Sequence, residues 1–273
     1  MNRGEGRRYH PIVTDNGVGE DATAGPRGAG DGRSWYSDIA AAIPILCVPM
    51  QATLVEQILE HAAPARILRQ VAENLEQEAR DRAAFREWLK PDVKAEFING
   101  TIIMHSPAKR RHNQATKAIA YLIESFDLQF DVGEVAIEKA LVGLERNDVE
   151  PDVCFWRKET AADFTDDMDV YPAPDLVVEV LSKSTKSRDR GVKKEAYALD
   201  GVSEYWIVDP VAETVEQYLL DAEDADAVGY RLTGKFRGEE IIRSVAIVNF
   251  SLAARACFDR SVRAGVVAGW STS

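Results

Sequence analysis

The sequence has few of the features of disulfide-bonded, zinc-binding or membrane proteins. Its three cysteines, Cys47, Cys154 and Cys257, are odd in number and widely spaced, with no pairing at metal-ligand spacing. No apolar run reaches the roughly 18 residues that a membrane helix requires. Residues 39–48 are too short an apolar stretch, and too far from the N-terminus, for an ordinary signal peptide. These absences predict a reduced, cytoplasmic protein with no membrane partner.

Several catalytic signatures are missing as well. There is no glycine-rich phosphate loop, no His-x-x-x-His pair and no nucleophile elbow. The net charge of −12 argues against indiscriminate, tight binding to nucleic acid. Charge is nevertheless uneven: residues 109–112 and 183–194 are basic, and residues 145–175 and 213–226 are acidic. A nuclease could bind a nucleic-acid backbone with the two basic clusters. The alternative interpretation is that both clusters are solvated helix ends.

One acid stands alone in an apolar segment. Leu176 to Leu181 is an apolar run with Glu179 in its middle, flanked by Pro174 and by a Ser-Lys-Ser-Thr cluster. This pattern predicts a short buried strand. An ionised carboxylate inside such a strand costs roughly several kcal/mol unless a cation or strong donors meet it. Glu179 therefore needs a partner, and a divalent metal ion is the obvious one.

A second acid of this kind lies upstream, in the segment 149–156. Because strand side chains alternate, Asp152 and Cys154 would share one face, opposite Val153 and Phe155. A cysteine beside acids would have a raised pKa and be a poor nucleophile. Two acids on neighbouring short strands can converge on one hard cation, and Mg²⁺ or Mn²⁺ suits oxygen ligands.

Pro151-Asp152, followed by Glu179 in a strand, resembles the Pro-Asp…(Asp/Glu)-x-Lys core of the PD-(D/E)XK nuclease superfamily. Within it, the chain is similar to the Uma-type putative restriction endonucleases over about residues 96–220. The superfamily lysine, two residues after the acid, is here Leu181, and the resemblance implies that Lys193 on the following helix supplies the ammonium group. Further matching segments are Glu96-Phe-Ile-Asn-Gly-Thr-Ile, Ser106-Pro107 before His112, Asp189…Lys193…Tyr197 and Gly201-Val-Ser-Glu-Tyr-Trp-Ile-Val-Asp-Pro210.

The resemblance implies an α/β fold with a restriction-endonuclease-like core, in which helices flank a central mixed β-sheet. It implies an endonuclease dependent on Mg²⁺ (or Mn²⁺) that cuts DNA and leaves a 5′-phosphate. Asp152 and Glu179 would hold the metal ion that activates water and offsets charge in the transition state. Lys193 would add a fixed positive charge beside the scissile phosphate. Glu96 would be a third acid, acting through water, and His112 would touch the phosphate or orient Glu96.

Each role has a structural alternative. The assignments of Asp152 and Glu179 stand or fall together, because adjacent carboxylates repel unless a cation holds both ionised. Lys193 lies four residues after Asp189, so the alternative to a role at the phosphate is a surface ion pair between these two residues. If the helix is rotated, Lys194 would supply the ammonium group in place of Lys193. The residues expected to contact nucleic acid are Lys109, Arg110, Arg111, Ser182, Lys183, Lys186 and Arg188.

Composition divides the chain into four parts. Residues 1–34 hold eight of the eighteen glycines and almost no apolar pattern, which predicts a disordered leader, or sequence upstream of a start at Met50. Residues 35–90 predict a helical extension, whose long second helix could carry a homodimer contact. Residues 91–258 are expected to form the nuclease domain, and 259–273 a C-terminal tail.

Local patterns predict the elements of that domain. Asn99-Gly100 predicts a hairpin turn. A helix capped by Ser106 would begin at Pro107 and run to about residue 125, with His112 on its inward face. A second helix is expected over 187–199. Strands are expected near 131–141, 151–156, 176–181, 204–208, 215–220, 230–232 and 241–248, with turns at 221–229 and 234–239.

Two other functions fit the same residues. A non-cleaving nucleic-acid-binding or scaffold module with this fold would explain the displaced lysine and the acidic surface. A metal-dependent phosphodiesterase acting on small or modified nucleotides would be less hindered by the negative net charge.

Overall fold

The computed structural model describes residues 50–221 and 228–270. The expected disordered leader, the first part of the helical extension up to residue 49, and most of the turn expected at 221–229 lie outside the described residues. By its contacts the chain divides into residues 1–56 and residues 57–273. The helices are α1 (Met50–Glu60), α2 (Pro64–Trp88), α3 (Arg110–Phe130), α4 (Lys186–Arg190), α5 (Val192–Leu199) and α6 (Arg260–Trp270), with a 3₁₀ turn over Ala254–Cys257. None of these helices has the length and apolarity needed to cross a membrane.

A six-stranded mixed sheet forms the centre of the second unit, which confirms the predicted fold class. Its strand order is β11-β10-β9-β8-β6-β3, and only β8 and β9 are parallel neighbours. The strands are β3 (Gly133–Ile137), β6 (Val153–Arg157), β8 (Leu176–Val180), β9 (Glu204–Asp209), β10 (Thr214–Asp221) and β11 (Gly229–Arg237).

A second sheet has five strands, in the order β2-β1-β5-β4-β7. Its strands are β1 (Ala95–Ile98), β2 (Thr101–Met104), β4 (Leu141–Gly143), β5 (Asp148–Val149) and β7 (Val170–Tyr171). β1 and β2 form the predicted hairpin, with positive φ at Asn99 and Gly100. The chain crosses to the six-stranded sheet at Pro151, where the missing N–H of proline removes no ladder hydrogen bond. A short pair, β12 (Ile241–Arg243) and β13 (Ser251–Ala253), completes the strands described.

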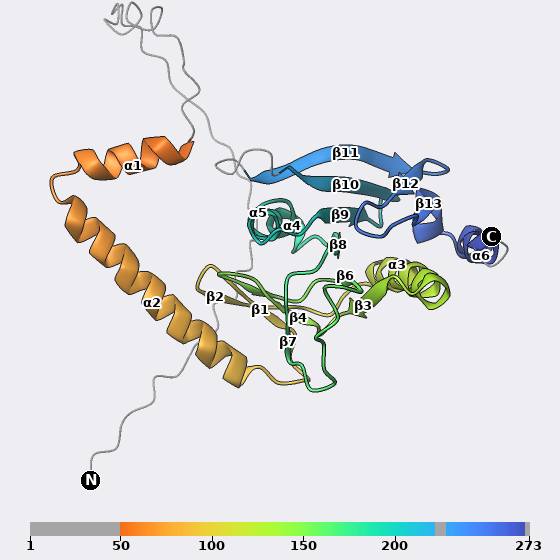
Figure 1. Cartoon of the computed structure of the whole chain (residues 1–273), viewed down its shortest axis with the longest axis horizontal. Coiled ribbons are helices and arrows are strands. Elements are labelled where there is room, and N and C mark those ends of the chain that lie inside the picture. The colour runs from red at the N-terminus through yellow and green to blue at the C-terminus, as the bar shows by residue number, and fades with distance from the viewer. Residues whose placement is uncertain (1–49, 222–227, 271–273) are drawn as a thin grey trace, which may run out of the picture. The chain divides into compact units, whose positions relative to one another are not determined.

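Each face of the six-stranded sheet buries its own apolar cluster. Ile119 of α3 packs with Val178 of β8 on one face, and Trp270 of α6 joins that cluster. On the opposite face, Tyr197 of α5 packs with Val177 of β8 and with apolar residues of the second sheet. The central strands β6 and β8 therefore lie between two packed layers, with α3 on one side and α5 on the other (Figure 1). Polar side chains on these strands can reach solvent only at their ends.

Several element boundaries differ from the sequence-based expectations. Helix α3 begins at Arg110, without a side-chain cap from Ser106, because the backbone of His105 still pairs with Lys94. The single helix expected over 187–199 is interrupted at Gly191, where a β-carbon would lie 3.1 Å from a backbone oxygen. The turn expected at 234–239 is strand until Arg237. The strand expected at 131–141 divides between the two sheets, the one expected at 241–248 ends at residue 243, and the expected C-terminal tail contains α6.

Candidate active site

The register of two central strands places Asp152 beside Glu179. β6 and β8 are antiparallel, with Val153 opposite Val178. Extending this ladder by one residue sets Asp152 opposite Glu179 on the same face, where opposed side chains have β-carbons about 4.5–5.5 Å apart. The backbone N–H of Val180 donates to Asp152 Oδ2 at 2.8 Å, which holds this carboxylate against the end of β8. Two buried acids thus lie side by side where the sequence analysis expected them.

Two donors from α5 meet a single oxygen of Glu179. Lys193 Nζ lies 2.5 Å from Oε1, and the Tyr197 hydroxyl donates to the same oxygen at 2.8 Å. Burial raises the pKa of Glu179 to about 8, and the opposing charge of Lys193 does not cancel that shift. Burial would lower the pKa of Lys193, but the carboxylates of Glu179 and Glu96 raise it well above its ordinary value. Lys193 therefore keeps its positive charge inside the protein.

At the strand position where the superfamily has its lysine, this chain has an apolar residue, and the ammonium group beside Glu179 comes from helix α5 instead. Leu181, where the superfamily lysine would stand, is buried in the apolar cluster beneath α5. The structure places Lys193, rather than Lys194, beside Glu179. Nζ of Lys194 instead lies 3.8 Å from the centre of the Tyr218 ring.

Strand β1 brings a third acid, Glu96, to the same ammonium group. Lys193 Nζ donates to Glu96 Oε1 at 2.8 Å, and the backbone N–H of Glu150 donates to that oxygen at 3.0 Å. His105 Nε2 lies 2.9 Å from Glu96 Oε2. Burial alone would raise the pKa of Glu96, but Lys193 and His105 hold it well below its ordinary value. Glu96 is therefore an ionised, fully buried carboxylate that fixes Lys193 in place.

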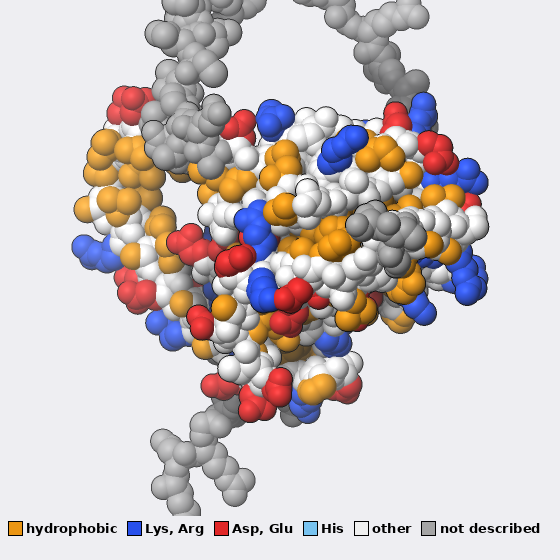
Figure 2. Space-filling model, turned by 45° about the vertical axis from the view of Figure 1, so that its right-hand side comes forward, with side chains coloured by type: hydrophobic (Ala, Val, Ile, Leu, Met, Phe, Trp, Pro, Cys, Tyr) orange, Lys and Arg blue, Asp and Glu red, His pale blue; other side chains and the backbone are white. Residues whose placement is uncertain are grey.

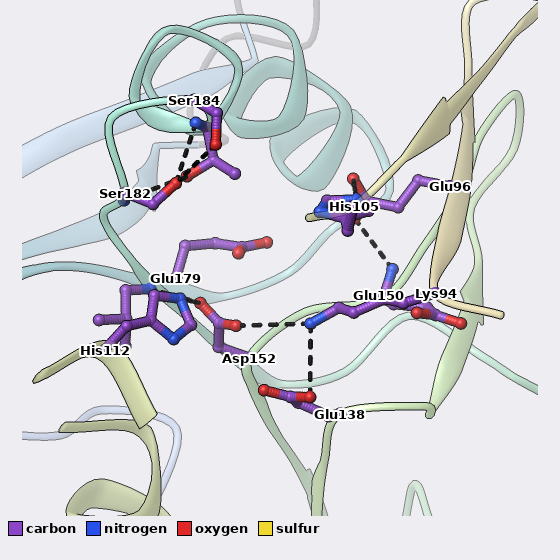
Figure 3. A network of polar contacts seen from close by, with 12 residues as sticks. Lys94, Glu96, His105, His112, Glu138, Glu150, Asp152, Glu179, Ser182 and Ser184 are labelled. Atoms are coloured by element: carbon purple, nitrogen blue, oxygen red, sulfur yellow. Dashed lines mark hydrogen bonds and ion pairs between the residues drawn. The ribbon is translucent and has the colours of Figure 1, made fainter. Parts of the chain in front are cut away.

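The first turn of α3 places His112 against Asp152. His112 Nε2 lies 3.2 Å from Asp152 Oδ2, and it contacts this acid rather than Glu96. Burial alone would lower the pKa of His112, but the hydrogen bond and charge of Asp152 raise it. Lys94, which immediately precedes β1, has Nζ 3.9 Å from Asp152 Oδ1 and 3.7 Å from Glu138 Oε2 (Figure 3). Cationic groups thus surround the acid pair on two sides.

The free oxygens of the acid pair suit a divalent cation. Within the part of the chain that the structure describes, neither Asp152 Oδ1 nor Glu179 Oε2 accepts a hydrogen bond. His112, Glu138 and Asp152 also each offer a ligand atom, all within 4.8 Å of one another. Oxygen ligands favour Mg²⁺ or Mn²⁺, whereas an imidazole nitrogen also suits Zn²⁺ or Fe²⁺. The residues therefore fit a metal ion of the expected kind.

The basic residues expected to contact nucleic acid lie in two segments that border these acids. Residues 109–111 are exposed and immediately precede His112. Residues 182–188 begin three residues after Glu179, and the hydroxyl of Ser182 contacts those of two neighbouring loop residues at 3.0 and 3.1 Å. On the face shown in Figure 2, acidic and basic side chains of the described residues are interspersed. Positive charge on that face is therefore not gathered into a single patch.

Four polar residues near the acids were not predicted from the sequence: Lys94, His105, Glu138 and Glu150. Strand alternation was the available signal for two of them, because Lys94 is two residues from Glu96, and Glu150 is two residues from Asp152. Glu150 is buried with Oε2 unpaired among the described residues, and burial raises its pKa. No local pattern distinguished His105 or Glu138, since their positions depend on how the two sheets pack.

Comparison with known proteins points to a nuclease. The model of the Uma2 family, described as "Putative restriction endonuclease", matches residues 82–255. The chain is similar to the crystal structure of a putative nuclease belonging to DUF820 from Anabaena variabilis, with a TM-score of 0.54 and 16% sequence identity. The similarity covers 64% of this chain and 94% of that chain, and at this identity it shows the fold alone. No curated protein matches significantly.

Proposed function

We propose that this chain, which belongs to the Uma2 family of putative restriction endonucleases, is a metal-dependent endonuclease that hydrolyses phosphodiester bonds in DNA. One observation carries the proposal. Asp152 and Glu179 are buried side by side at the ends of adjacent strands, with the ammonium group of Lys193 at 2.5 Å from Glu179. Paired carboxylates can hold a metal ion, and a fixed cation beside them can stabilise negative charge on a phosphate, so the arrangement suits metal-assisted phosphodiester hydrolysis.

The side chains of the site would divide the work as follows. Asp152 and Glu179 would hold a divalent cation through their free oxygens, and His112 would fix the orientation of Asp152. A bound cation would act as a Lewis acid at the phosphate and make an attacking water more acidic. Lys193, held in place by Glu96, would stabilise negative charge as it develops on the phosphate oxygens. The exposed lysines and arginines of residues 109–111, together with exposed Lys183 and Lys186 and half-buried Arg188, would bind the DNA backbone.

The test is cleavage of supercoiled plasmid, linear duplex and single-stranded DNA at low salt with Mg²⁺, Mn²⁺ or EDTA. Glu179→Gln keeps an amide oxygen that can accept from Lys193 and Tyr197, so we expect it to fold and to lose cleavage. Glu124→Gln makes the same chemical change at an exposed position of α3 and should cut like the wild type. Full activity of Glu179→Gln would refute the site.

Metal binding gives a second readout that does not depend on turnover. We expect calorimetry to show Mn²⁺ binding to the wild type and to Glu124→Gln, and weaker binding to Glu179→Gln. DNA binding in gel shifts without cutting under any metal condition would support the non-cleaving module instead.

A further inference from the structure

Asp152 has an acid on each side of it in the six-stranded sheet. Its strand β6 lies between β8, which leads to Glu179, and β3, which Glu138 follows directly. Ile137 of β3 pairs with Val153, so extending this ladder by one residue sets Glu138 opposite Asp152. Opposed side chains of this kind have β-carbons about 4.5–5.5 Å apart. Two gaps of similar width therefore flank Asp152, and each is bordered by two carboxylates.

Lys94 reaches into the gap on the β3 side. Its Nζ lies 3.9 Å from Asp152 Oδ1 and 3.7 Å from Glu138 Oε2, and Figure 3 shows the side chain extending to these two carboxylates. Both distances are longer than a hydrogen bond, so the ammonium group is held there by charge. The Lys94 side chain is 23% exposed, whereas that of Lys193 is 3% exposed and hydrogen-bonded to Glu96. Lys94 is therefore a loosely held internal cation.

The same gap contains the ligand atoms of a metal site. A ring nitrogen of His112 and a carboxylate oxygen from each of Glu138 and Asp152 lie within 4.8 Å of one another. The His112 side chain is 9% exposed, and its Nδ1 has no hydrogen-bond partner among the residues that the structure describes. A divalent ion bonds such ligands at about 2.0–2.2 Å, so it would lie nearer both carboxylates than the ammonium group of Lys94 does now. Two cations that close repel strongly, so the gap can hold the ammonium group or an ion, but not both.

We infer that Lys94 fills a second cation position, between Asp152 and Glu138, and thereby limits the site to one divalent ion. The inference rests on the proposed function, which places that one ion between Asp152 and Glu179. In two-metal sites, ions about 3.5–4 Å apart stabilise both the attacking and the leaving oxygens of a phosphate. Lys94 supplies the second of these positive charges from the chain itself.

The experiment counts the Mn²⁺ ions bound by the whole chain without DNA, from the electron paramagnetic resonance signal of free Mn²⁺. At the same free Mn²⁺ concentration, Lys94→Met should bind one ion more than the wild type. Lys94→Arg keeps the positive charge and should bind as many ions as the wild type. Adding Glu138→Gln to Lys94→Met removes a ligand and should abolish the extra ion. Lys117→Met removes the charge of an exposed lysine on α3, and as the matched control it should leave the count unchanged.

Three results would overturn the inference alone: no extra ion in a Lys94→Met protein that circular dichroism shows to be folded, an extra ion that persists in the double variant with Glu138→Gln, or an equal gain in Lys117→Met. Lys94→Gln, which also removes the charge, takes the place of Lys94→Met if that variant does not fold. The count should fall by one in Glu179→Gln. If it does not fall, or if the wild type binds no Mn²⁺, the metal ion of the proposed function is wrong, and this inference with it.

Discussion

Removing the ammonium group of Lys193 should cost more stability than any other single lysine change in the site. Its side chain is 3% exposed and serves two carboxylates, Glu96 at 2.8 Å and Glu179 at 2.5 Å. Breaking a buried ion pair by removing one partner costs about 3–5 kcal/mol, because the remaining charge stays buried and unpaired. Lys193→Met keeps the length and apolar stem of the side chain, so this loss should appear almost entirely as an electrostatic penalty.

The assay is urea unfolding followed by circular dichroism at pH 7 without divalent metal. Lys194→Met is the matched control on the same helix, where the contact with the Tyr218 ring is lost, and it should cost about 0.5–1 kcal/mol. Adding Glu96→Gln to Lys193→Met removes one stranded charge. The double variant should therefore be more stable than the sum of the two single losses by at least about 1 kcal/mol.

The sign of the pH dependence follows from the same argument. In Lys193→Met the acids lose their cation, so the folded pKa of Glu96 should rise above its unfolded value, and that of Glu179, already raised by burial, should rise further. Such groups destabilise the protein as pH rises, and the deficit relative to wild type should therefore shrink as pH falls toward 4.5. Lys193→Met behaving like Lys194→Met, or an additive cycle with Glu96→Gln, would refute the reasoning.

Three further changes test the packing around the site. Arg190, with help from Lys235, lowers the pKa of Glu216 to about 2. The stability that Glu216 contributes is therefore present above about pH 4.5 and is lost as pH falls toward 2. The difference in unfolding free energy between wild type and Glu216→Gln should be about 1–2 kcal/mol at pH 7 and should vanish in acid. Glu204 is buried and accepts five hydrogen bonds, so Glu204→Gln should lower the unfolding free energy by about 3 kcal/mol in urea titrations, and a loss below about 1 kcal/mol would contradict this. Phe85→Ala empties a buried ring position at the end of α2 and should cost about 3–5 kcal/mol in the same assay; a near-neutral result would show that α2 contributes little to the core.

The acid pair could be predicted because its signal is local. A lone glutamate in an apolar run and an aspartate after proline both stand out against their neighbours, and strand alternation then places each on a definite face. The hairpin turn at Asn99-Gly100 is equally local, since the required positive φ angles select these residue types. Each of these features is determined within a few residues of chain.

The rest of the site depends on contacts between distant segments. Glu96 meets Lys193 across 97 residues, and Arg157 of β6 bonds to the carbonyl oxygen of Ala246 across 89. No periodicity could have shown that the chain changes sheets at Pro151, or that His105 would lie over Glu96. The start of α3 was mispredicted for the same reason, because a tertiary contact of His105 overrides a good local capping sequence.

The position of Lys193 has a consequence for how related proteins are recognised. The charged atom stands beside Glu179, but it reaches that place from a helix fourteen positions further along the chain, and the strand position it would otherwise occupy has become part of the apolar interior. A search that demands a lysine two places after the acid would discard this protein as inactive. What such proteins have to preserve is a location in space, and different parts of the chain can fill it. The absence of a lysine from the motif is therefore weak evidence that a protein of this family lacks an ammonium group beside its buried glutamate.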